Sequence, residues 1–250
     1  MIREDISGDS MIVDVHTHIG GDLDGAMQSK EELLLSMKAN KIDKAVVFPF
    51  NEKGNVLEKS IELLGKCRKD RRFINFLRFD PKTITKDTLE EHLPLFRGVK
   101  LHPRSQNFDP LDKKYFWVYK MIEDSRKPVI FHTRKENNPN SDPDRIVKLA
   151  ALFPRMNIII GHFAGASNVA FGEIAARRNL YVETSVLSSN YLIGYVTKKV
   201  VGADKVIFGS DAPYSDQEIE LLKIKKAGLS RSDERKVLGG NISKLLKLDG

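Results

Sequence analysis

The sequence predicts a single-domain α/β protein folded as a (β/α)₈ TIM barrel, and three observations support this prediction. Eight short apolar runs alternate with eight segments whose apolar residues recur at helical spacing. Several of the runs are apolar throughout, as is typical of parallel strands covered by helices. The length of 250 residues fits one barrel, and no linker rich in Gly, Ser or Pro divides the chain. We therefore expect residues 1–250 to form one domain.

The eight strands are expected where the apolar runs occur. Pro49 closes the second run, since a proline lacks the N–H that a ladder needs. In chain order the runs are MIVDVHTH (11–18), KAVVFP (44–49), FINFLRF (73–79), RGVKLHP (97–103), KPVIFH (127–132), NIIIGH (157–162), LYVETS (180–185) and KVIFGSD (205–211).

A helix is expected after each strand. Ser29 is a typical N-cap for the first of them. The last segment, 230–248, is predicted to form a closing helix that packs on the outside of the barrel. The eight helical segments are 29–40, 56–70, 84–96, 113–125, 142–154, 169–178, 190–201 and 217–228.

The composition bears on partners and location. A net charge of +7 and a pI near 9.3 suggest polyanion binding, but the basic residues are mixed with acids, and no basic stretch is interleaved with aromatic residues. We therefore expect a small-molecule substrate and no nucleic acid. No apolar run reaches the roughly 18 residues of a membrane span, and the acidic N-terminal segment is unlike a signal peptide. With Cys67 as the single cysteine, these features predict a cytoplasmic protein. Its oligomeric state is open, a homo-oligomer included.

Five of the six histidines end predicted strands, and three of them recur at intervals of thirty residues. Thirty residues is about the length of one strand, its helix and the two connecting loops. A barrel gathers the carboxyl ends of its strands at one face, where the active sites of this fold lie. The side chains brought together in this way would be His16, His18, His102, His132, His162 and Asp211.

This set of side chains predicts a metal site. His16 and His18 project to the same side of their strand, about 7 Å apart, and can share one ion. His132 and Asp211 would complete a nitrogen and oxygen ligand set suited to a divalent ion, with zinc expected. His162 could also be a ligand, or it could hydrogen-bond the substrate.

Four further residues are expected near this site. Lys100 and His102 lie two positions apart, so both face the barrel interior if either does. A carbamylated Lys100 could bridge two ions, a charged one could bind an anionic substrate, and a third reading is a structural ion pair. His102 could contact the substrate or a second ion. Arg104 and Arg134 follow strand-end histidines, and their guanidinium groups could bind a substrate carboxylate.

The chain resembles the amidohydrolase superfamily, specifically its amidohydrolase-2 branch. The resemblance covers nearly the whole chain and rests on DVHTHIG, GVKLHP, VIFHT, IIIGHFAG, FGSDAPY and the tail ERKVLGGNISKLL. It implies that His16, His18, His132 and Asp211 bind a divalent metal. It also implies that His162 polarises the substrate and that Asp211 accepts a proton.

The first functional hypothesis is a metal-dependent hydrolase. It would cleave a small amide, lactone or ester that carries a carboxylate, using a metal-activated water. The alternative is a metal-dependent, non-oxidative decarboxylase on the same site. A phosphoesterase or nuclease similar to the TatD family is less expected, because strand four offers Lys100 and His102 where those enzymes place a bridging Glu. A metal-binding protein without catalytic activity is the remaining class.

Overall fold

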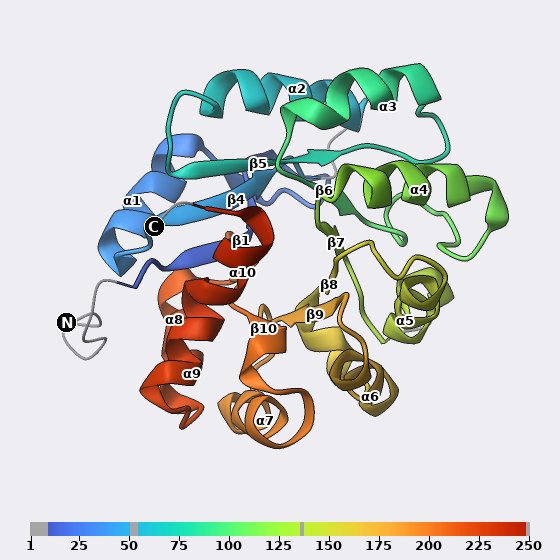
Figure 1. Ribbon diagram of the computed structural model, residues 1–250. Helices are drawn as coiled ribbons and strands as arrows, with labels where there is room; N and C mark the ends of the chain where they lie inside the picture. Colours follow the sequence, from blue (N-terminus) through green and yellow to red (C-terminus); the bar gives the residue numbers. More distant parts are fainter. Residues whose placement is uncertain (1–9, 51–54, 136–137, 249–250) are drawn as a thin grey trace.

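The computed structural model describes residues 10–50, 55–135 and 138–248. Within these ranges, eight parallel strands follow one another in chain order around a nearly closed barrel, and they confirm the predicted TIM barrel (Figure 1). The strands are β1 (Val13–His18), β4 (Lys44–Phe48), β5 (Phe73–Arg78), β6 (Gly98–Leu101), β7 (Val129–Phe131), β8 (Ile158–Ile160), β9 (Leu180–Glu183) and β10 (Val206–Ile207).

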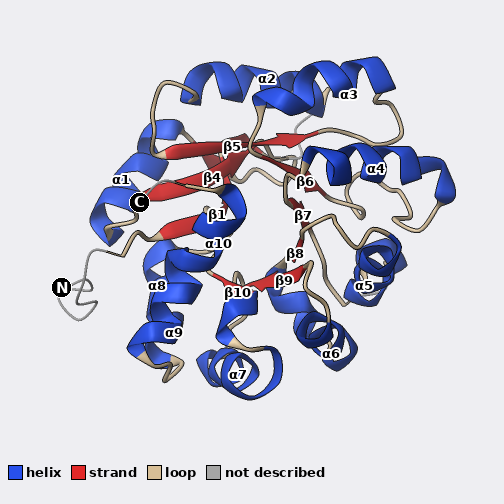
Figure 2. Cartoon of the chain, viewed as in Figure 1, coloured by secondary structure: helices blue, strands red, loops and turns tan. Residues whose placement is uncertain are grey.

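Helices surround the strands, as Figure 2 shows, and each predicted helical segment contains one. A short antiparallel hairpin, β2 (Gly20–Gly21) and β3 (Met27–Gln28), follows the first strand and was not predicted. The helices are α1 (Lys30–Asn40), α2 (Val56–Cys67), α3 (Lys86–His92), α4 (Phe116–Ser125), α5 (Pro143–Leu152), α6 (Asn168–Ala176), α7 (Asn190–Val196), α8 (Gln217–Lys226), α9 (Arg231–Arg235) and α10 (Asn241–Leu246).

Local chemistry explains where the first helix begins. The Ser29 hydroxyl accepts a hydrogen bond from the backbone N–H of Glu32, and the Glu32 carboxylate accepts one from the backbone N–H of Ser29. This reciprocal capping box satisfies two N–H groups that the first turn of a helix leaves without partners. The N-cap expected at Ser29 is therefore confirmed.

The chain's tail corrects one expectation. Residues 230–248 were predicted to pack outside the barrel, but α10 lies across its amino-terminal end (Figure 1). Ile242 and Leu246 of this helix belong to the same apolar cluster as Val15 and Ile207, whose strands line the interior. Helix α10 therefore covers the end of the barrel opposite the face where the strands end, and its apolar residues close the interior cluster there.

The seam between the first and last strands is closed by isolated contacts and not by a regular ladder within the described residues. The backbone N–H of Val15 donates to the Phe208 carbonyl at 3.1 Å, and that of His18 donates to the Ala212 carbonyl at 2.9 Å. The backbone N–H of Asp211 donates to the His16 carbonyl at 2.7 Å. The seam thus places the segment after β10 directly against β1.

Close packing at the tail gives a testable prediction. A Cβ added at Gly239, within the π-helical segment Lys236–Gly240 that precedes α10, would lie 1.9 Å from the Met11 carbonyl oxygen, which belongs to the backbone. We expect Gly239→Ala to lower the free energy of unfolding by about 3 kcal/mol, because a packed core does not yield to added volume. The fall in the thermal midpoint should be roughly 6–12 °C for a chain of this length.

Gly65 provides the matched control. It lies within α2, and no heavy atom comes within 4 Å of the Cβ that it would gain. Gly65→Ala should raise the free energy of unfolding by about 0.5–1 kcal/mol, since alanine favours the helix. Equal midpoints for the two variants in a thermal melt would show that the Gly239 contact is not tight.

None of the helices in the described part of the chain has both the length and the apolar character that crossing a membrane requires.

Candidate metal centre and substrate cavity

The strand-end side chains meet at the carboxyl face of the barrel. His16 and His18 lie on β1, Lys100 lies on β6, and Glu183 ends β9. Further side chains come from the residues just after β6, β7, β8 and β10, namely His102, His132, His162 and Asp211. The structure therefore brings these strand-end side chains to one face, as a parallel barrel does.

Three of these side chains form a compact cluster. The Oδ1 atom of Asp211 lies 3.1 Å from Nε2 of His16 and 3.2 Å from Nε2 of His18. One ligand atom from each of the three lies within 4.8 Å of the others. All three side chains are buried, so the cluster is shielded from bulk water.

Burial sets the charge state of this cluster. It lowers the pKa values of His16 and His18, because a charged imidazolium loses hydration there. Burial would raise the pKa of Asp211, but the neighbouring imidazoles of His16 and His162 outweigh it and hold that pKa well below its usual range. Neutral imidazoles beside a carboxylate are the protonation states that metal binding requires.

Asp14 fixes the backbone on both sides of the cluster. Its carboxylate accepts hydrogen bonds from the backbone N–H groups of His16 at 3.1 Å and Ser210 at 2.9 Å, and from the Gln217 amide at 2.8 Å. Burial raises the pKa of Asp14 to about 6. Because His16 and Ser210 belong to opposite sides of the barrel seam, Asp14 holds the strand-one histidines and Asp211 in register.

Three histidines from β6, β7 and β8 form a second group. The ring of His102 stacks on that of His132 with 3.6 Å between centroids. The Nδ1 atom of His132 lies 2.9 Å from Nε2 of His162. The other ring nitrogen of His132, Nε2, is buried and has no hydrogen-bond partner among the described residues.

His162 begins a left-handed turn. The φ angles of residues 162–166 are all positive, a conformation that glycine tolerates best. A Cβ at Gly165 would lie 2.9 Å from the backbone nitrogen of Lys135, so this position also needs the smallest residue. The small residues in HFAGAS thus let the turn pack against the loop after β7 and aim the His162 ring into the site.

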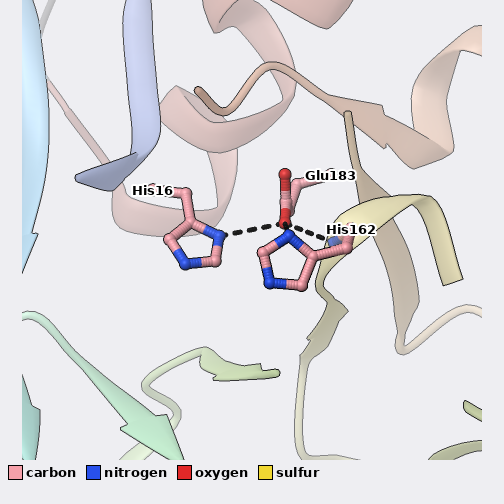
Figure 3. A group of neighbouring side chains, drawn as sticks. All are labelled: His16, His162 and Glu183. Atoms are coloured by element: carbon pink, nitrogen blue, oxygen red, sulfur yellow. Dashed lines mark hydrogen bonds and ion pairs between the residues drawn. The ribbon is translucent and has the colours of Figure 1, made fainter. Parts of the chain in front are cut away.

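Glu183 was missed by the sequence analysis. Its Oε1 atom lies 3.0 Å from Nδ1 of His16 and accepts from the backbone N–H of His162 at 2.6 Å (Figure 3). Burial would raise the pKa of Glu183, but interactions with His16 and His162 lower it to about 2. Its position at the end of LYVETS, a predicted strand, was the signal that could have found it.

Lys100 and Arg78 bring two basic side chains to the same cavity as the cluster. The Nζ atom of Lys100 lies 2.8 Å from Nε2 of His16, and burial lowers the pKa of Lys100 to about 7. Arg78, at the end of β5, is almost wholly buried and donates to the Pro49 carbonyl at 2.9 Å and to the Ser105 hydroxyl at 3.3 Å. Arg78 was not predicted as a site residue, although FINFLRF ends in the same way as the other strands.

A cavity of about 440 Å³ opens above the cluster, within the usual range for small-ligand sites. Arg104 and Arg134, both expected at the mouth, line this cavity. A neighbouring hollow of about 340 Å³ shares His132, Arg134, Val186 and Asp211 with it. Residues 136–137, which follow Lys135 in the segment after β7, lie outside the described part of the chain.

The residues present fit a divalent metal ion. His16, His18 and Asp211 direct nitrogen and oxygen atoms to one point, and such donors suit zinc and manganese. The buried Nε2 of His132 has no partner among the described residues and is a donor of the right kind, but it is not among the ligand atoms that lie within 4.8 Å of one another there. A buried imidazole nitrogen without a partner is costly unless something binds it. The ligand roles predicted for these four residues remain proposals.

Comparisons with known proteins agree with this architecture. Residues 13–248 match the protein family described as Amidohydrolase. A search of curated proteins finds no match.

Several solved structures resemble the chain. A 2,6-dihydroxybenzoate decarboxylase from Rhizobium superposes with a TM-score of 0.77 at 17% identity, covering 97% of this chain and 100% of that one. A 5-carboxyvanillate decarboxylase from Sphingomonas paucimobilis gives 0.77 at 15% identity, covering 96% and 100%. A dihydroxybenzoic acid decarboxylase from Polaromonas, with bound manganese and the inhibitor 2-nitroresorcinol, gives 0.78 at 16% identity, covering 96% and 98%.

At these identities the structural likeness shows the fold. The family match is the stronger finding, because it spans all eight strands and the tail. The resemblance drawn from the strand-end motifs is therefore confirmed, and the chain is an enzyme that belongs to the amidohydrolase-2 family.

Proposed function

We propose that the protein is a metal-dependent, non-oxidative decarboxylase of a small aromatic carboxylic acid. The observation that carries the proposal is the cluster of His16, His18 and Asp211 at the floor of a cavity whose wall includes guanidinium groups. The structural comparisons support this proposal, because the similar solved structures described above are decarboxylases of carboxylated phenols. These comparisons favour decarboxylation over the hydrolysis that we expected first.

The cavity has the chemistry that an aromatic acid requires. Arg104 and Arg134 offer the planar, bidentate donors that recognise carboxylates. Tyr214 and the apolar residues Leu23 and Val186 line the same space and can cover the face of a ring. The cavity volume suits a single substituted ring better than a polymer.

His16, His18, His132 and Asp211 would hold the metal ion. When bound, such an ion supplies Lewis acidity that withdraws electron density from the substrate. The protein's own groups would position the acid through Arg134 and exclude water through the buried histidines. Asp211 lines both hollows, so we assign it the relay of a solvent proton to the carbon that loses the carboxylate. The bond between the ring carbon and the carboxylate carbon breaks, carbon dioxide leaves, the electron pair of that bond stays on the ring carbon, and the relayed proton adds there.

Isotope incorporation distinguishes the two reactions. Protein loaded with Mn²⁺ or Zn²⁺ would be incubated with a panel of hydroxybenzoic acids in D₂O and, separately, in H₂¹⁸O. Decarboxylation releases carbon dioxide and leaves one deuterium on the carbon that lost it. A parallel panel of small amides and lactones tests hydrolysis, which would place ¹⁸O in the product. Hydrolysis without carbon dioxide release would overturn the proposal in favour of the first hypothesis.

A further inference from the structure

The carboxylate of Glu183 has four hydrogen-bond contacts among the described residues. Its Oε1 atom faces Nδ1 of His16 at 3.0 Å and accepts from the backbone N–H of His162 at 2.6 Å and from the Ser185 hydroxyl at 2.9 Å. Its Oε2 atom accepts from the backbone N–H of Ser185 at 2.6 Å. Three of these contacts converge on Oε1, so this oxygen serves as the acceptor for His16, His162 and Ser185.

The first consequence concerns His16. A neutral imidazole carries one proton, and a carboxylate surrounded by donors can only accept. Nδ1 of His16 must therefore be the protonated nitrogen, and its Nε2 atom carries a lone pair. That lone pair points to the cluster, where Lys100 Nζ lies at 2.8 Å and Asp211 Oδ1 at 3.1 Å.

The second consequence passes through Ser185. Its hydroxyl has one hydrogen, which it gives to Glu183, so its oxygen accepts from Nδ1 of His162 at 2.9 Å. The Nε2 atom of His162 is then without a proton and accepts from Nδ1 of His132 at 2.9 Å. His132 is left with an unprotonated Nε2, the same buried atom that has no partner in the described part of the chain.

We propose that Glu183 is a positioning residue that sets the tautomers of His16, His162 and His132 through one directed hydrogen-bond network. Two branches start at the same carboxylate, one direct to His16 and one relayed by Ser185 and His162 to His132. Both branches end in an Nε2 lone pair, which is the form of imidazole that binds metal. The inference rests on the metal site of the proposed function, but the tautomers exist whatever reaction follows.

His18 lies outside this network. Its Nε2 atom faces Asp211 at 3.2 Å, and its Nδ1 atom has no hydrogen-bond partner among the described residues. Glu183 therefore makes no contact that would set its tautomer. His18 is the internal control for any change made at Glu183.

The test is nuclear magnetic resonance of metal-free protein labelled with ¹⁵N at histidine. Long-range ¹H–¹⁵N spectra at pH 8 report which ring nitrogen carries the proton, and single His→Gln variants assign the signals. We expect His16, His132 and His162 of the unmodified protein to be protonated at Nδ1. A proton on Nε2 of His16 or His132 would overturn the inference, and this measurement needs no variant at Glu183.

Two variants separate the branches. Ser185→Ala should leave His16 protonated at Nδ1 and give mixed tautomers at His162 and His132. Glu183→Gln should disturb both branches and weaken Zn²⁺ binding by about 10–100-fold in competition with a chromophoric chelator. Glu123→Gln, which removes another buried carboxylate from α4, is the matched control and should change neither readout.

The outcomes are distinguishable from failure of the proposed function. Unchanged tautomers and unchanged Zn²⁺ affinity in folded Glu183→Gln protein would refute the role of Glu183. The expected tautomers and affinity loss, in a protein that releases no carbon dioxide from any acid tested, would support the network and reject the decarboxylase.

Discussion

Replacing Asp211 with asparagine is expected to lower turnover by about 10³-fold. Asparagine keeps the size of the side chain but removes its negative charge and its capacity to carry a proton. Both losses act at the same place, because Asp211 contacts His16 and His18 and lines the cavity. Loss of a positioned proton carrier alone costs about 10²–10⁴-fold. The measurement is the rate of carbon dioxide release, or of product formation, at saturating substrate and metal.

Stability and a control variant make this result interpretable. The backbone N–H of Asp211 still donates to the His16 carbonyl after the substitution, so the barrel seam should persist. Circular dichroism and the thermal midpoint should therefore stay close to those of the unmodified protein. Gly65→Ala, which touches nothing near the site, should keep full turnover. An Asp211→Asn variant with near-normal turnover would rule out the mechanism.

Removing divalent metal is expected to abolish turnover and to lower the thermal midpoint. A ligand that binds only the folded chain stabilises it by about 2.7 kcal/mol when present at one hundred times its dissociation constant. Without the ion, the ligand atoms of His16, His18 and Asp211 remain close together, but the folded chain loses the stabilisation that metal binding gives it. Activity and melting temperature should be compared before chelation, after it, and after adding back Mn²⁺ or Zn²⁺.

Metal content distinguishes the open alternatives. One ion per chain would support the site at His16, His18, His132 and Asp211, whereas two would indicate a bridged centre through Lys100. His18→Ala should lose the metal-dependent rise in melting temperature. His92→Ala is the control, because His92 ends α3 and bonds the Thr88 carbonyl away from the site. Full activity in protein shown to be free of metal would contradict the proposed chemistry.

The strands, and the convergence of the strand-end side chains at one face, could be predicted from the sequence for one physical reason. In a parallel barrel all strands end at one face, so strand-end residues such as His102 and His132 must converge even though thirty positions separate them. The position of each side chain in the sequence was enough to place it. The tail was mispredicted because amphipathic spacing shows that a helix buries a face but not which surface it covers.

The reaction type was beyond this reasoning, whereas Glu183 was overlooked although it lies at the end of a predicted strand. Its contact with Nδ1 of His16, 167 positions away, is visible only in the closed barrel. Hydrolysis and decarboxylation were left open because both can use the same metal ligands, so the strand-end motifs cannot separate them. The distinction resides in the cavity wall, where loop residues such as Arg104 and Tyr214 are placed by the fold.

The seam between β1 and β10 makes the metal centre depend on closure of the barrel. His18 and Asp211 are 193 positions apart in the chain, and they meet only across that seam. Closing the chain over this separation costs conformational entropy before the contact forms. A barrel that has not closed its seam therefore has an incomplete ligand set. A bound ion would link β1 to the segment after β10. Metal occupancy would therefore report that the barrel has closed.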